Sequence, residues 1–281
     1  MKTRSYAKIN LSLDVVNKRE DGYHNIKTIM QKVSLYDELE FNIIKSGFVL
    51  NSDLKVPVED NLIYKSWKVM CNFVGRELPI EITLKKNIPM AAGLAGGTGN
   101  GAVTLKALNK IYNLNLSLED LKEMSLSLGA DFPYMLQGGT VLAEGIGEEF
   151  TELAPFEGVS VLIVNPGYEI STKVVYENLK IDENRIDFKG IVNCMENKSI
   201  LSLKSLLENK MQDYVFKVHP DIKIIVEELS KLGAVSLMSG TGASVFGLFN
   251  NCEDMKYAHS ILAKRYKYAF MTCTVGGYDE V

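Results

Sequence analysis

The chain has 281 residues, 46% of them hydrophobic and 23% charged, with a formal net charge of −4. This is the composition of a globular protein of about two domains, and it lacks the basic surplus of a nucleic-acid-binding surface. The four cysteines form no C-x-x-C pair, which disfavours zinc and redox dithiol sites, and the absence of a signal-peptide or membrane-spanning apolar run predicts a cytoplasmic protein.

Residues 5 to 15 alternate between apolar and polar side chains, which predicts a β-strand. Lys8 and Asn10 fall on its polar face, so a ligand approaching that face would meet both of them. The alternative is an ordinary solvated strand face. The elements expected next are further strands within 33–43, a helix over 62–74 and a short strand over 80–84.

A glycine-rich loop is expected from Pro89 to Gly101, followed by a buried helix from Ala102. Its glycines would let the backbone approach a ligand, and the helix N-terminus would offer unpaired N–H groups to a phosphate. A flexible or packing turn is the alternative. The loop contains no lysine, so it is not a Walker A motif, and its glycine spacing does not fit a dinucleotide-dependent oxidoreductase.

The expected strands and helices do not alternate regularly along the chain, which favours an α+β fold over a doubly wound sheet. A capping box at Ser117 opens a helix that Gly129 ends just before Asp131. The pattern restarts near residue 156, so we predict two domains, 1–156 and 157–281. The later elements expected are strands over 159–164, 234–238, 244–249 and 270–275, helices over 221–232 and 254–263, and a loop over 239–243.

Five segments, in order over nearly the whole chain, resemble the superfamily of galactokinase, homoserine kinase, mevalonate kinase and phosphomevalonate kinase. Within it they resemble the family of 4-diphosphocytidyl-2-C-methyl-D-erythritol kinases, for which Asp21-Gly-Tyr-His24 is the most specific marker. The segments are Ala7–Leu11, Arg19–His24, Pro89–Ala102, Gly129–Pro133 and Met238–Gly247. The resemblance implies a ribosomal-protein-S5-like N-terminal domain that binds ATP, a ferredoxin-like C-terminal domain that binds substrate, and an active site in the cleft between them.

The resemblance also implies ATP-dependent phosphorylation of the 2-hydroxyl of 4-diphosphocytidyl-2-C-methyl-D-erythritol in non-mevalonate isoprenoid biosynthesis. Asp131 corresponds to the family's catalytic base and Lys8 to its partner. The residues that correspond to the ATP-phosphate loop are Pro89, Met90, Ala91, Ala92, Gly93, Leu94, Ala95, Gly96, Gly97, Thr98 and Gly99. Those that correspond to the substrate site are Asn10, Tyr23, His24, Thr172 and Tyr176. Mg²⁺ is expected with ATP, and the sequence names no protein ligand for it.

The loop departs from the commoner family pattern, in which two hydroxyl residues precede Asp or Asn. Here Gly99 stands between Thr98 and Asn100, so one hydroxyl is missing. Two alternatives therefore stay open: another small-alcohol kinase of the superfamily, and a catalytically weak nucleotide-binding paralogue. For Asp131, the alternative is a residue that only caps the turn before Pro133. A monomer or homodimer is expected, without a nucleic-acid or membrane partner.

Overall fold

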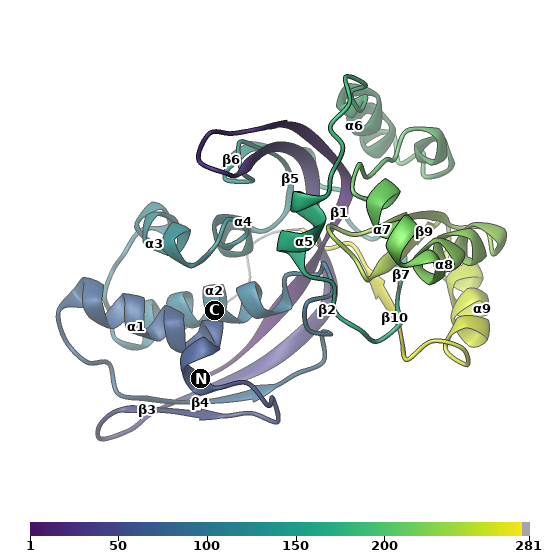
Figure 1. The fold of residues 1–281 in the computed structure, drawn as a ribbon. Coiled ribbons are helices and arrows are strands. Elements are labelled where there is room, and N and C mark those ends of the chain that lie inside the picture. Colours follow the sequence, from purple (N-terminus) through teal and green to yellow (C-terminus); the bar gives the residue numbers. More distant parts are fainter. Residues whose placement is uncertain (277–281) are drawn as a thin grey trace.

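The computed structural model describes residues 1–276, which form two β-sheets with helices on their outer faces (Figure 1). The strands of the first sheet are β1 (Lys2–Lys18), β2 (His24–Ile43), β3 (Phe48–Asn51), β4 (Ile80–Lys85), β5 (Thr140–Glu144) and β6 (Glu149–Glu152). The order is β3-β4-β2-β5-β6, and β1 pairs with β2 in antiparallel fashion over most of its length. These two long strands connect the two halves of the molecule.

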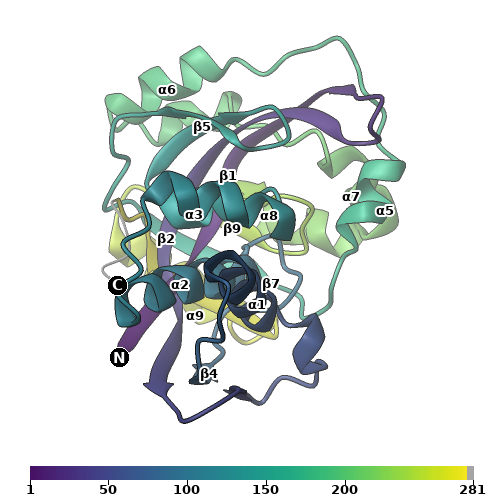
Figure 2. The ribbon, with the colours of Figure 1, turned by 90° about the vertical axis from the view of Figure 1, so that its left-hand side faces the viewer.

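Helices cover one face of the first sheet (Figure 2). They are α1 (Leu62–Val74), α2 (Gly96–Ile111), α3 (Leu118–Ser125) and α4 (Phe132–Gln137). The prediction for α1 is confirmed: Asn61 accepts the N–H of Ile63 at its start, and Gly75 ends it with φ 69°. The helices enclose a core with inward-facing side chains of β2 and β4, among them Leu39, Phe41, Ile80 and Ile82. Within the described residues, no helix is both long and apolar enough to cross a membrane.

The second sheet has the ferredoxin-like topology that was expected. Its strands are β7 (Ser160–Asn165), β8 (Val235–Met238), β9 (Val245–Phe249) and β10 (Tyr268–Cys273), and its helices are α8 (Pro220–Lys231) and α9 (Cys252–Leu262). The strand order β10-β7-β9-β8 is antiparallel throughout, and the chain runs β-α-β-β-α-β. The α+β prediction is therefore confirmed. Three helices between β7 and α8 were not predicted: α5 (Thr172–Glu177), α6 (Phe188–Glu196) and α7 (Gln212–Val218).

The two sheets share a hydrophobic core. Ala7, Ile9 and Leu11 of β1 pack in one cluster with Val161 and Phe246 of the second sheet. The other face of that sheet packs against α8 and α9. The division between the sheets falls between β6 and β7, and the boundary at 156/157 stays a prediction because this core crosses it.

The glycine-rich segment differs from the prediction because α2 begins at Gly96 and not at Ala102. A Cβ atom added at Gly99 would lie 2.7 Å from Ser5 Oγ, and one at Gly101 would lie 2.7 Å from the Phe132 ring. These glycines therefore let the helix backbone approach β1 and α4. Helix propensity alone predicts a loop here, and this close packing overrides it.

Candidate active site

The segment that leads into α2, together with the first three residues of that helix, has a run of amide groups without a protein acceptor among the described residues. We call residues Pro89–Thr98 the glycine loop. The φ angle is positive at alternate residues, 43° at Ala91, 74° at Gly93 and 53° at Ala95. Alternating left-handed residues of this kind form a concave nest of N–H groups that suits an anion.

The amides of this nest are unpaired within residues 1–276. The N–H groups of residues 93–98 donate to no acceptor in this part of the chain, and the first amide bonded inside the helix is that of Gly99, which donates to Ala95 O at 2.8 Å. A helix N-terminus adds the positive end of its dipole. The geometry of the glycine loop is therefore suited to an anion, and its unpaired donors end at Thr98.

The carbonyl groups of the same segment are held by the protein. Three hydrogen bonds do this: Ser244 N–H to Ala92 O (3.2 Å), Ser239 Oγ–H to Gly93 O (2.9 Å) and Lys8 N–H to Leu94 O (3.1 Å). Because the C=O and N–H of a trans peptide point in opposite directions, anchoring the carbonyls on the protein side turns the amides outward. The nest is therefore preorganised.

Lys8 and Asp131 form an ion pair beside the glycine loop. Lys8 Nζ lies 3.5 Å from Asp131 Oδ2, and it donates to Asn10 Oδ1 at 2.7 Å. The Lys8 side chain is 6% exposed and that of Asp131 38% exposed. The cation is therefore fixed in the interior, while the carboxylate can be reached from outside. The idea that the polar face of β1 is solvated is wrong, since Lys8 and Asn10 are both buried.

Asp131 does not cap the helix that follows it. It precedes α4, but its side chain makes no capping hydrogen bond to the helix. The reading of Asp131 as a simple cap therefore fails. The following Phe132 is fully buried, and its ring packs against Gly101 of α2, so the position of Asp131 relative to α2 is set by helix packing.

Two further residues fix Asn10, and neither has a predicted role. The Asn10 side chain donates to Thr28 Oγ1 at 2.9 Å, and its backbone N–H donates to Ser239 Oγ at 3.2 Å. Ser239 lies within a segment that carries the family resemblance, so a signal existed. Thr28 had no local signal, because its partner lies on the neighbouring strand.

An aromatic pair forms the other end of the site. The rings of His24 and Tyr176 lie 5.1 Å apart with an angle of 31° between their planes. Burial and the nearby charge of Lys18 lower the pKa of His24, so its ring is neutral near pH 7. Burial and the negative charge of Asp131 raise the pKa of the Tyr176 phenol. This effect links the aromatic end electrostatically to the Lys8–Asp131 pair.

The other two predicted substrate residues differ in their surroundings. Thr172 lies one turn before Tyr176 in α5, and its hydroxyl is 3.2 Å from that of Thr241. Tyr23 is 60% exposed on the turn before His24. The substrate-binding roles of Asn10, Tyr23, His24, Thr172 and Tyr176 stay predictions.

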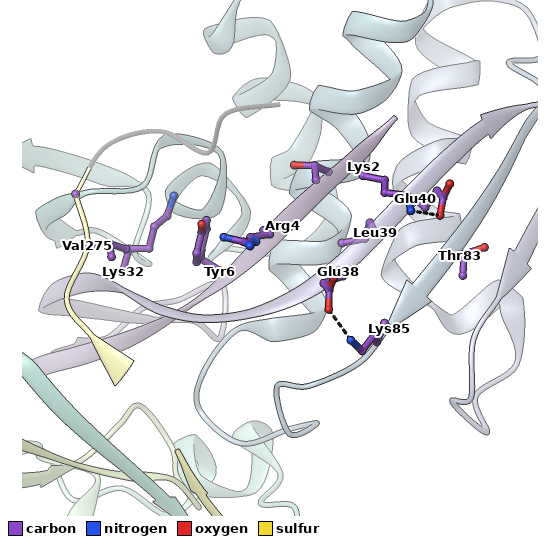
Figure 3. A pocket seen from close by; sticks show the side chains of 12 residues that line it. Lys2, Arg4, Tyr6, Lys32, Glu38, Leu39, Glu40, Thr83, Lys85 and Val275 are labelled. Atoms are coloured by element: carbon purple, nitrogen blue, oxygen red, sulfur yellow. Dashed lines mark hydrogen bonds and ion pairs between the residues drawn. The ribbon is translucent and has the colours of Figure 1, made fainter. Parts of the chain in front are cut away.

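A separate hollow of about 810 Å³ lies on the face of β1, β2 and β4 that the helices leave open (Figure 3). Two of its cations are paired with carboxylates, Lys2 with Glu40 at 3.4 Å and Lys85 with Glu38 at 2.8 Å. It includes neither Lys8 nor Asp131. It is therefore not the candidate active site.

Comparisons with known proteins agree with this geometry. Residues 61–140 match the family model "GHMP kinases N terminal domain", and residues 191–267 match "GHMP kinases C terminal". The first match contains the glycine loop and Asp131. The second contains Ser239 and the two helices that cover the second sheet.

Curated relatives match the whole chain. The 4-diphosphocytidyl-2-C-methyl-D-erythritol kinase of Clostridium perfringens is 40% identical, with 98% of each chain covered. That of Thermoanaerobacter pseudethanolicus is 41% identical over 98% of this chain and 96% of its own. A crystal structure of 4-(cytidine 5'-diphospho)-2C-methyl-D-erythritol kinase superposes with a TM-score of 0.87 at 28% identity, covering 99% of this chain and 100% of the other. A crystal structure of L. major mevalonate kinase shares the fold, with a TM-score of 0.74 at 16% identity, covering 98% of this chain and 96% of the other.

Proposed function

The chain belongs to the 4-diphosphocytidyl-2-C-methyl-D-erythritol kinase family of GHMP kinases, and from this we propose that it transfers the γ-phosphoryl group of ATP to the 2-hydroxyl of 4-diphosphocytidyl-2-C-methyl-D-erythritol. The reaction supplies a phosphorylated intermediate to non-mevalonate isoprenoid biosynthesis. The observation that carries the proposal is the Lys8–Asp131 ion pair beside a nest of unpaired amides. One group of residues can hold a triphosphate, and the other can act on a hydroxyl.

The glycine loop binds the ATP phosphates in this proposal. Phosphoryl transfer asks a protein mainly to position the nucleophile and to neutralise charge. The amides of residues 93–98 and the N-terminus of α2 supply partial positive charge without a lysine in the loop. Gly99, which the family resemblance also assigns to this loop, contributes through packing because its amide is bonded to Ala95.

Asp131 accepts the proton of the attacking hydroxyl. Its carboxylate is accessible, and the ammonium of Lys8 lies 3.5 Å away, where it offsets charge that develops on the transferred group. Asn10 holds Lys8 in place through the 2.7 Å hydrogen bond. His24 and Tyr176 form the surface on which the cytosine ring is recognised, with Thr172, Tyr23 and Asn10 completing the substrate site.

Mg²⁺ accompanies ATP in this proposal, and its contribution would be to neutralise charge on the phosphate oxygens. In residues 1–276, no group of three or more His, Cys, Asp and Glu side chains could hold a metal. The residues that fit an ion bound mainly through phosphate and water are few. Thr98 is at the first turn of α2, and Asn100 Oδ1 is buried without a hydrogen-bond partner.

The test is a coupled ADP-release assay with 4-diphosphocytidyl-2-C-methyl-D-erythritol and MgATP. Mevalonate, homoserine and galactose serve as alternative acceptors. Turnover with the diphosphocytidyl alcohol alone supports the proposal. Turnover with another acceptor alone would assign the chain to a different GHMP kinase activity, and ATP binding without turnover on any acceptor would favour a weak paralogue. A cytoplasmic location and a monomeric or homodimeric state stay predictions.

A further inference from the structure

One buried hydroxyl connects the glycine loop to β1 and to the second half of the chain. Ser239 begins the segment Ser239–Ala243, which we call the Gly240 loop, and is 0% exposed. Its Oγ accepts the backbone N–H of Asn10 at 3.2 Å and donates its proton to Gly93 O at 2.9 Å. Both partners are main-chain groups. Ser239 therefore fixes the positions of two backbone segments and not of two flexible side chains.

The contact between the two loops is close enough to transmit small displacements. A Cβ atom added at Gly93 would lie 2.2 Å from Ser239 O and 3.1 Å from Gly242 O, so backbone meets backbone here. The Gly240 loop is itself held by Asn209, whose side-chain amide donates to Met238 O and Gly240 O at 2.8 Å each. Asn209 is buried. The glycine loop thus rests on a support that is rigidly fixed to the second half of the molecule.

The hydrogen bond to Gly93 O also sets the direction of a neighbouring donor. Gly93 C=O and Leu94 N–H belong to one planar trans peptide, so a bond that holds the carbonyl on the protein side directs the Leu94 amide outward. That amide is one of the unpaired donors of the nest. At the same time, Ser239 binds the backbone of Asn10, whose side chain holds Lys8 beside Asp131.

We propose that Ser239 is a positioning residue that aligns the Leu94 amide of the nucleotide site with the Lys8–Asp131 pair. The inference rests on the proposed kinase function and adds a residue to its machinery. Ser239 touches no reacting atom in this arrangement. Ser239 acts through the orientation of the Gly93–Leu94 peptide and the position of β1. Its loss should therefore lower the affinity for the ATP phosphates more than the affinity for the alcohol.

The experiment compares the wild type with Ser239→Ala by calorimetric titration with MgAMP-PNP and by steady-state kinetics. We expect the Kd for the nucleotide and the KM for ATP to rise about tenfold, because the loss of roughly one net hydrogen bond lowers affinity by about that factor. The KM for the alcohol should change less than about twofold, and the affinity for adenosine, which has no phosphate, should stay within the same limit.

Ser236→Ala is the matched control. Ser236 lies three residues earlier, is half-buried, and donates to a main-chain carbonyl, that of Val226 at 2.8 Å, and its side-chain hydrogen bonds reach neither loop. A general loss of packing would give the two variants similar nucleotide affinities. If Ser239→Ala does not accumulate as folded protein, Ser239→Cys keeps a side chain of similar size with a weaker hydrogen-bonding group, and the same rise in Kd is expected of it.

The outcomes separate this inference from the proposed function. A wild type that binds nucleotide but phosphorylates no alcohol overturns the function, while a selective rise in Kd for Ser239→Ala still supports the positioning role. An active wild type whose Ser239→Ala and Ser239→Cys variants keep normal nucleotide Kd and KM overturns the positioning role alone. An equal weakening of ATP, adenosine and alcohol binding also overturns it. A wild type that binds no nucleotide overturns both.

Discussion

The two glycine-rich loops of this protein touch each other, yet they differ in how many of their amides are paired. The glycine loop leaves the amides of residues 93–98 unpaired and gives its carbonyls to the protein. In the Gly240 loop, the amides of Ser239 and Gly242 donate to Ser244 O and Ser239 O at 2.9 Å, and Asn209 binds two carbonyls at the loop. Glycine content is therefore a poor guide to ligand binding, and the pairing of the amides is a better one.

The largest effect is expected at Asp131, which acts on the substrate hydroxyl in the proposal and belongs to neither loop. Asp131→Asn should lower kcat on the order of 10³-fold, because the amide cannot accept the hydroxyl proton, while the Kd for nucleotide changes less than about threefold. The substitution is nearly isosteric, and the side chain it replaces makes no capping bond. Turnover by Asp131→Asn close to that of the wild type would remove Asp131 from the mechanism.

The next largest effect is expected where Gly93 of the glycine loop contacts the Gly240 loop. Gly93→Ala places a Cβ atom 2.2 Å from Ser239 O at a residue whose φ is 74°. We expect a loss of about 3 kcal/mol in the free energy of unfolding, measured by urea denaturation. Gly97→Ala is the control, since its Cβ would meet only a side-chain atom of Leu62 at 3.6 Å. If the two substitutions lowered the free energy of unfolding equally, the close contact between the loops would not explain the effect of Gly93→Ala.

A smaller effect is expected where the sequence departs from the family pattern. Gly99→Ser restores the missing hydroxyl, but its Cβ would lie 2.7 Å from Ser5 Oγ, at a cost of about 2 kcal/mol. Ser5→Ala removes that atom, which is buried without a partner, and should be nearly neutral alone. In a double-mutant cycle by thermal denaturation, we expect Ser5→Ala to restore about 1 kcal/mol to Gly99→Ser. If the stability effects of Gly99→Ser and Ser5→Ala simply added in the double variant, the predicted clash between residues 99 and 5 would be contradicted.

The smallest effect lies at the aromatic end. Because burial lowers the pKa of His24 below the usual 6.5, the folded protein disfavours the charged ring. The contribution of His24 to stability is therefore complete above pH 6.5 and is lost as the pH falls through the lowered pKa. An NMR titration of the His24 ring should show a midpoint below 6.5, and Lys18→Met should raise it. A midpoint above 6.5 would contradict the burial.

The sequence predicted the elements that have strong local signals. The alternation in β1, the extent of α1 and the strand–helix order of the second sheet were all predicted. The start of α2 was not, because the reason for Gly99 and Gly101 lies in Ser5 and Phe132, which contact them only in the fold. The short helices α5 and α7 have six and seven residues, which is too few for a clear helical repeat. α6 has a local signal that was missed, because Asp187 caps it and Phe188, Ile191 and Met195 follow at helical spacing.

Some residues of the candidate site could be predicted from the sequence and others could not. Lys8, Asp131 and the glycine loop could be named because the family resemblance passes through them, and the structure brings them together. Thr28 and Asn209 act through partners that lie far away along the chain, 18 residues from Thr28 to Asn10 and 31 from Asn209 to Gly240. No pattern of neighbouring residues reports such a pairing.

The packing of α2 on α4 has a consequence for protein engineering. Phe132 packs against Gly101, and the Met135 side chain lies 2.9 Å from where a Cβ of Gly99 would be. The helix that carries the unpaired amides and the helix that follows Asp131 are therefore packed closely on each other. Grafting the glycine-rich stretch of a relative into this chain would misplace the carboxylate unless residues 5, 132 and 135 were exchanged with it. For recombination between homologues, these positions form one inseparable block.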